Sequence, residues 1–145
     1  LWPSWEGTHP PTSLVVNVFP MDVYEDNGCT EIWPGSHRVS GVITDALVEA
    51  RSAEVPPIPA VAPKGSVIVR DLRLWHRGVP NTSDEFRHMI AMIHHIHWYG
   101  RKNKVLYQAG LEAAFESEDL DHNAEFVNES LDYLFDRRAT RRGAK

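Results

Sequence analysis

Short segments of β-strand composition, separated by turns rich in glycine and proline, run through the chain from Leu14 to Tyr99. Leu14–Tyr24 is rich in β-branched and aromatic residues, and the EDNG stretch after it has the Asn-Gly pair that favours a tight hairpin turn. We therefore predict that the CTEIW stretch from Cys29 returns as the partner strand of that hairpin. Many short strands with such punctuation favour a β-sandwich or a β-barrel.

The next segments extend this pattern. A short helix is predicted over Ser40–Ala53, and the proline density of Glu54–Gly65 excludes both a helix and a central strand, which favours a crossover on the surface. Three further strands are predicted. They are Gly65–Asp71, Leu72–Gly78 and the longer, alternating Phe86–Tyr99.

The sequence changes character after Gly100. Residues 101–145 contain helix formers, acidic residues and apolar residues at helical spacing, and they end in the basic stretch DRRATRRGAK. We predict C-terminal helices here, with a solvated acidic face over Glu112–Asp136. The length of 145 residues suits one hydrophobic core, so residues 101–145 are expected to be a helical extension and basic tail of one domain.

Charge and composition exclude several classes of partner. The formal charge is −5 and the basic cluster is confined to the terminal stretch, so nucleic acid is not an expected partner. No stretch approaches the ~20 apolar residues of a membrane span, so no membrane association is expected. Cys29 is the only cysteine and the chain shows no signal peptide, which favours a reducing, cytoplasmic compartment.

The chain contains eight histidines, and two of them form a candidate metal pair. His95 and His97 lie two positions apart on a predicted strand, so both would point to the same face and could chelate one zinc ion. A zinc site needs a third protein ligand, which no Cys/His cluster supplies. A zinc hydrolase and a purely structural pair both stay open. We interpret four other histidines as structural, namely His9, His88, His94 and His122.

Two stretches carry a resemblance to a known family. They are DNGCTEIWPGSHR, which begins at Asp26, and PKGSVIVRDLRLWHRGVPNTSDEFR, which ends at Arg87. Together they resemble the phytanoyl-CoA dioxygenase family of iron(II)- and 2-oxoglutarate-dependent oxygenases, over roughly Leu14 to Tyr99. The resemblance implies a mainly β fold, a double-stranded β-helix of jelly-roll or cupin-like type. Residues 1–100 would be the C-terminal portion of that oxygenase barrel.

The resemblance also implies roles for individual residues. In the family, two histidines and one carboxylate hold the iron and leave positions open for 2-oxoglutarate and O2. His76 would be the second histidine. Arg87 would bind the distal carboxylate of 2-oxoglutarate, a task that suits its planar pair of donors. Ser83 would add a hydroxyl hydrogen bond to that carboxylate, while Asn81 is expected to stabilise the turn. His37, in the PGSH turn, is not an iron ligand in the family.

The chain departs from the family at one motif. The other iron ligands belong to an H-x-D or H-x-E sequence, and none of the eight histidines has Asp or Glu two positions later. We therefore expect a chain that is truncated on its N-terminal side, binds iron poorly and is inactive alone. The implied parent activity is hydroxylation of a small molecule with release of succinate and CO2, although the missing motif leaves a halogenase open. A non-catalytic barrel of the same fold is a further alternative.

Overall fold

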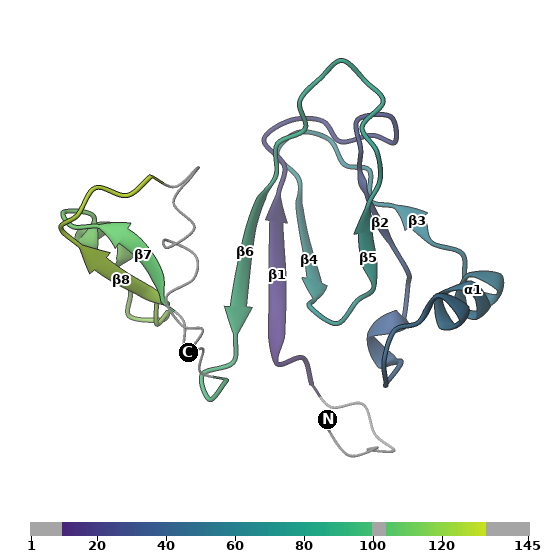
Figure 1. The fold of residues 1–145 in the computed structure, drawn as a ribbon, viewed down its shortest axis with the longest axis horizontal. Coiled ribbons are helices and arrows are strands. Elements are labelled where there is room, and N and C mark those ends of the chain that lie inside the picture. Colours follow the sequence, from purple (N-terminus) through teal and green to yellow (C-terminus); the bar gives the residue numbers. More distant parts are fainter. Residues whose placement is uncertain (1–9, 100–103, 133–145) are drawn as a thin grey trace. The chain divides into compact units, whose positions relative to one another are not determined.

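The computed structural model describes residues 10–99 and 104–132, and these are mainly strand and loop with little helix. The chain forms two compact units, Leu1–Ile96 and His97–Lys145 (Figure 1). The prediction of a single domain that divides at residue 100 stays a prediction. Among the described helices, none combines the length and the apolar character needed to cross a membrane.

The first sheet is antiparallel and has the strand order β4-β1-β6 (Figure 1). The central strand β1 (Ser13–Val18) pairs with β4 (Val67–Asp71) on one side and with β6 (Ile90–His95) on the other. In this register Arg70 and Ile93 lie opposite Val15 on the two neighbouring strands. Because side chains alternate along a strand, Val15, Asn17 and Arg70 share one face of the sheet.

The two faces of this sheet differ in burial. On β1 the side chains of Ser13, Val15 and Asn17 are buried, and this face lies towards the second sheet. The opposite face is apolar and remains exposed within residues 10–99. Its large exposed side chains are Leu14, Val67, Val69, Ile90 and Met92.

The second sheet has the order β3-β2-β5, with β3 (Ile58–Pro59), β2 (Thr30–Ile32) and β5 (His76–Gly78). The predicted crossover thus contains a two-residue edge strand, a position that tolerates proline. A hydrophobic core cluster has its buried residues in the segment between β1 and β2. It consists of Phe19, Val23 and Cys29, with Ala62, Ile68 and Val79 packed against them.

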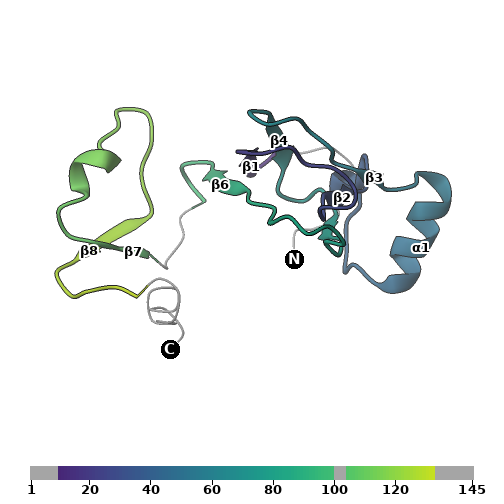
Figure 2. The same cartoon turned by 90° about the horizontal axis from the view of Figure 1, so that it is seen from above.

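The predicted helix is present as α1 (Asp45–Glu54), which lies beyond β3 in both views (Figures 1 and 2). Thr44 caps it, because its hydroxyl accepts a hydrogen bond from the backbone N–H of Leu47 at 3.3 Å. The helix ends before the Pro-Pro pair that begins at Pro56, where proline disfavours helical conformation in the residue before it.

The second unit contains no α-helix in residues 104–132. It has β7 (Val105–Gln108) and β8 (Ala124–Val127), paired in parallel, and a short 3₁₀ helix, η2 (Glu112–Phe115). The prediction of helices is therefore wrong for this part of the chain. Aromatic packing explains the difference, because the ring of Phe115 lies 4.5 Å from that of Tyr107 and 5.3 Å from that of Phe126. The residues after 132 lie outside the described part.

The predicted hairpin is also wrong. Strand β2 pairs with β3 and β5, and not with β1. No non-glycine residue in the described ranges has a positive φ, so Asn27 does not take the conformation that the hairpin turn needs. Its fully buried side chain instead accepts from the backbone N–H of Tyr24 at 3.0 Å and donates to the carbonyl of Asp22 at 2.9 Å. Three predicted strands shorten to β4, β5 and β6.

Candidate active site

His76 is the first residue of β5, and its exposed imidazole has a defined tautomer. Its Nδ1 atom lies 2.8 Å from the carbonyl oxygen of Leu74. Because a carbonyl oxygen only accepts hydrogen bonds, Nδ1 carries the proton and donates it. The lone pair then resides on Nε2, which is the state that a histidine needs in order to bind a metal ion through that atom.

The residue before His76 is held by the WPGS turn. Strand β2 leads through Trp33 into this turn and a 3₁₀ helix, η1 (Ser36–Arg38). The N–H of Trp75 donates to the hydroxyl of Ser36 at 2.8 Å, and the carbonyl of Trp75 accepts from the N–H of Trp33 at 3.0 Å. Both backbone groups of Trp75 are thus bonded to the turn. The PGSH motif therefore supports the position of His76, while His37 lies in η1.

Arg70 and Asn17 had no predicted role, yet Arg70 lies beside His76 and Asn17 lies beside Arg70. The guanidinium of Arg70 approaches both ring nitrogens of His76, Nδ1 at 3.4 Å and Nε2 at 3.3 Å. Since Nδ1 already donates to Leu74, it cannot also accept, whereas Nε2 accepts a hydrogen bond from Nη2 of Arg70. The Nε atom of Arg70 also lies 3.4 Å from Oδ1 of Asn17, on β1. Burial lowers the pKa of Arg70.

Arg87 is half-buried and lies in the loop before β6, not at the start of the predicted longer strand. Its Nη1 atom is 4.0 Å from the sulfur of Met89. The positive charge of Arg87 reaches the buried thiol of Cys29. Burial and the carboxylate of Glu25 raise the pKa of that thiol, and the charge of Arg87 opposes them.

Ser83 and Asn81 are bonded to each other in the turn between His76 and Arg87. The hydroxyl of Ser83 donates to Oδ1 of Asn81 at 2.8 Å, and Nδ2 of Asn81 donates to the carbonyl of Glu85 at 2.7 Å. Asn81 therefore stabilises this turn, as expected. The predicted hydrogen bond from Ser83 to a cosubstrate requires the hydroxyl to exchange its bond with Asn81, and it stays a prediction.

The DNG loop also supports the turn that contains Asn81 and Ser83, through backbone hydrogen bonds. The carbonyl of Asp26 accepts from the N–H groups of Thr82 at 2.8 Å and Ser83 at 3.1 Å. Gly28 has a φ of +80°, and a Cβ atom there would lie 3.1 Å from the carbonyl oxygen of Val79. Only glycine meets both conditions without strain. The loop after β1 and the loop after β5 lie side by side in Figure 1.

The described residues fit one position of an iron site and do not complete it. The His76 tautomer suits a ligand, yet residues 10–99 and 104–132 contain no group of three His, Cys, Asp or Glu side chains that could hold a metal ion. A facial site needs two histidines and a carboxylate.

The structure does not bring His95 and His97 onto one strand face. Strand β6 ends at His95, and His97 lies in the turn that follows. The Nδ1 atom of His95 is 2.6 Å from the hydroxyl of Ser13, whereas Nδ1 of His97 is 3.3 Å from a carboxylate oxygen of Asp121. The strand geometry on which the zinc interpretation depended is therefore wrong.

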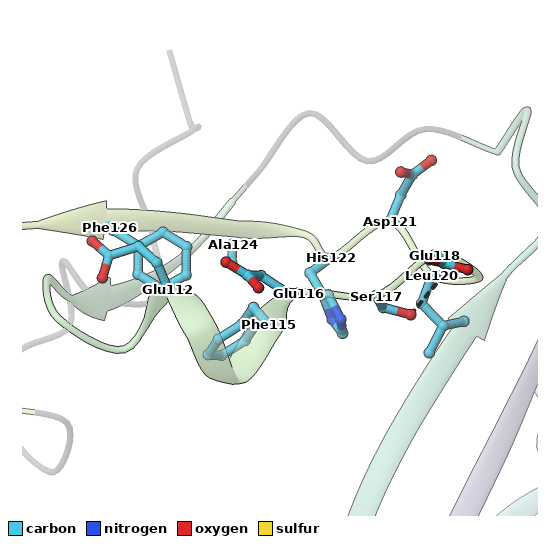
Figure 3. A pocket seen from close by; sticks show the side chains of 10 residues that line it. All are labelled: Glu112, Phe115, Glu116, Ser117, Glu118, Leu120, Asp121, His122, Ala124 and Phe126. Carbon is cyan, nitrogen blue, oxygen red and sulfur yellow. Dashed lines mark hydrogen bonds between the residues drawn. The ribbon is translucent and has the colours of Figure 1, made fainter.

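A pocket in the second unit contains none of the predicted site residues (Figure 3). Four acidic side chains and two phenylalanines contribute to its lining, and the ring of His122 packs edge-on against Phe115 at 5.3 Å. Acidic residues alone do not define a ligand. The acidic side chains are Glu112, Glu116, Glu118 and Asp121.

Comparison with known families decides the class. The sequence model of the family described as phytanoyl-CoA dioxygenase (PhyH) matches residues 1–89. The chain belongs to the phytanoyl-CoA dioxygenase family. The matched residues include the DNG loop, the PGSH turn, His76 and Arg87 of this phytanoyl-CoA dioxygenase family member. The family depends on iron(II) and 2-oxoglutarate.

Solved structures similar to this phytanoyl-CoA dioxygenase family member are oxygenases. EvdMO1 is 33% identical, with a TM-score of 0.50 over 57% of this chain and 19% of its own. EctD from S. alaskensis, solved with bound Fe, is 22% identical, with a TM-score of 0.52 over 56% of this chain and 30% of its own. A second EctD structure, with 2-oxoglutarate and 5-hydroxyectoine, is 23% identical at the same TM-score. This chain thus spans less than a third of the lengths of these structures, and the likeness to EctD shows a shared fold.

Proposed function

We propose that this chain contributes one iron ligand and one 2-oxoglutarate anchor to an oxygenase that hydroxylates a small molecule, with release of succinate and CO2. The observation that carries the proposal is the state of His76 in a chain of this family. Its Nδ1 donates to the carbonyl of Leu74, so Nε2 would be the ligand atom. Iron(II), when bound, would supply the activation of O2.

His76 and Arg87 would have separate tasks. His76 would hold the metal ion through Nε2. Arg87 would fix the direction of 2-oxoglutarate by donating two charge-assisted hydrogen bonds to its distal carboxylate. Ser83 lies in the turn before Arg87 and would add a third hydrogen bond once its hydroxyl leaves Asn81. The two remaining iron ligands would have to come from residues outside the sequence, since no H-x-D or H-x-E is present in it. The double-stranded β-helix is part of the same proposal.

Replacement of Arg87 tests the proposal. In a protein that contains this chain together with the two remaining iron ligands, Arg87→Ala is expected to weaken 2-oxoglutarate binding by about 2–5 kcal/mol, the scale for removing one partner of a buried charge pair. Isothermal titration calorimetry with iron(II) under nitrogen measures this loss. Arg77→Ala is the matched control, because Arg77 is 63% exposed on β5 and pairs with Glu31. Equal affinities in wild type and Arg87→Ala would remove Arg87 from the cosubstrate site.

The same preparation separates the oxygenase from a non-catalytic barrel. An oxygenase requires His76, so His76→Ala should abolish the weak visible absorption band that iron(II) and 2-oxoglutarate give together under nitrogen. The non-catalytic alternative predicts no such band in the wild type.

A further inference from the structure

Arg70 is a half-buried cation without an acidic partner in the described part of the chain. Its contacts there are to Asn17 and His76, and neither of these side chains is acidic. Partly buried charges are costly unless they are paired, so an arginine in this position favours a negatively charged neighbour. A guanidinium has five N–H bonds, and the contacts of Arg70 to Asn17 and His76 leave others for such a neighbour.

Two acidic residues on strands of the two sheets already have other partners. Asp71 follows Arg70 on β4 and therefore points to the opposite face of the sheet, where its carboxylate accepts from Arg73 at 2.6 Å. Glu31, on β2, accepts from Arg77 at 2.5 Å. Neither carboxylate is placed to neutralise Arg70. The described residues therefore leave a position for a carboxylate that is not their own.

Asn17 supplies a second, independent sign of a ligand. Its side chain is 5% exposed, and its Nδ2 atom has no hydrogen-bond partner among residues 10–99 and 104–132. A buried N–H group without an acceptor costs about 1–3 kcal/mol, which a ligand oxygen would recover. The Oδ1 atom of the same amide accepts from Nε of Arg70 at 3.4 Å, so the unsatisfied N–H group belongs to a side chain that lies beside the guanidinium.

We infer that Arg70 and Asn17 form a binding site for a small-molecule carboxylate beside His76, separate from Arg87. Both residues lie on the inner face of the β4-β1-β6 sheet, and the guanidinium touches the ring of the proposed iron ligand. The carboxylate belongs either to the cosubstrate, at its 2-oxo end, or to the primary substrate, which would then be an acid. The existence of the site follows from Arg70 and Asn17, whereas the identity of its ligand rests on the proposed function.

Nuclear magnetic resonance of the 145-residue chain tests the site without any metal or turnover. Sodium acetate is the probe, and sodium chloride at equal ionic strength controls for general screening. We expect acetate to shift the side-chain NH₂ signals of Asn17 and the Nε–H signal of Arg70 in a saturable manner. In Arg70→Met the shift of the Asn17 signals should require at least about tenfold more acetate, the loss that follows from one charge-assisted pair of hydrogen bonds. Arg77→Met, on β5 of the second sheet, should leave the response unchanged.

A competition experiment distinguishes the two sources of the carboxylate. If saturating 2-oxoglutarate shifts the same signals and abolishes the acetate response, the site holds the cosubstrate. If acetate still shifts them at saturating 2-oxoglutarate, the site holds an acidic primary substrate. Shifts no larger than those in chloride, or an unchanged acetate response in Arg70→Met, would overturn the inference. Failure of the proposed function would appear elsewhere, as an unchanged 2-oxoglutarate affinity in Arg87→Ala.

Discussion

The segment that leads to His76 and the loop that leads to Arg87 are held by different kinds of contact. The segment before His76 is held by a side chain, since the hydroxyl of Ser36 accepts a hydrogen bond from the N–H of Trp75. Before Arg87, backbone groups meet directly, because the carbonyl of Asp26 accepts from two N–H groups of the turn, and Gly28 allows the approach. Side-chain support fails when one atom is deleted, whereas backbone support fails when one atom is added. The two regions should therefore respond to opposite kinds of substitution.

Addition of a single carbon at Gly28 should have the largest effect. Gly28→Ala places a Cβ 3.1 Å from the carbonyl oxygen of Val79 and forces an L residue to a φ of +80°. Strain and overpacking together are expected to cost about 3 kcal/mol of unfolding free energy. Urea unfolding followed by tryptophan fluorescence measures it.

Gly65 offers a matched control for that experiment. Its φ is +86°, and a Cβ added there meets no atom within 4 Å. Gly65→Ala should therefore show the backbone strain alone, about 1–2 kcal/mol. Equal losses of unfolding free energy in Gly28→Ala and Gly65→Ala would show that the close approach of Gly28 to Val79 does not stabilise the loop before Arg87. The proposed contrast with the segment before His76 would then be wrong.

Deletion of the Ser36 hydroxyl should have the next largest effect, on the other side of the comparison. Ser36 is fully buried, so Ser36→Ala leaves the N–H of Trp75 buried without an acceptor, at a cost of about 2 kcal/mol. Hydrogen exchange of the Trp75 amide is the local measurement, and its protection should fall by more than that of the Thr82 amide. Ser40→Ala, at an exposed serine, is the control. Unchanged protection at Trp75 would contradict the role of Ser36.

The difference between these contacts also explains what the sequence could reveal. Gly28 and the His76-to-Arg87 spacing are local features, so they can be found by reading along the chain. The hairpin predicted at Gly28 is absent, because β2 pairs with β5 and not with β1. Arg70 and Asn17 are 53 positions apart and meet only because β1 and β4 pair, so neither stands out as a site residue in the sequence. The same limit applies to the second unit, where contacts of Phe115 with Tyr107 and Phe126 override helical propensity.

The turn between Arg70 and His76 is stabilised by the ion pair of Asp71 with Arg73, which depends on pH. Its loss is expected to have the smallest effect on the free energy of unfolding. Hydrogen bonds from Arg73 lower the pKa of Asp71, and the positive charge of nearby His37 acts in the same direction. A carboxyl group whose pKa is lower in the folded state stabilises the fold above its unfolded pKa of about 3.9, and this contribution is lost as the pH falls through the folded value.

Asp71→Asn should therefore cost about 1 kcal/mol at neutral pH and progressively less below about pH 4, because protonated Asp71 no longer forms the charge-assisted pair. Urea unfolding of wild type and variant across that range measures the difference. Asp84→Asn, at an exposed aspartate in the Arg87 loop, is the control. A cost that stays constant with pH would mean that the turn depends on the shape of Asp71 and not on its charge. The support of His76 would then be independent of pH, as the backbone support of Arg87 already is.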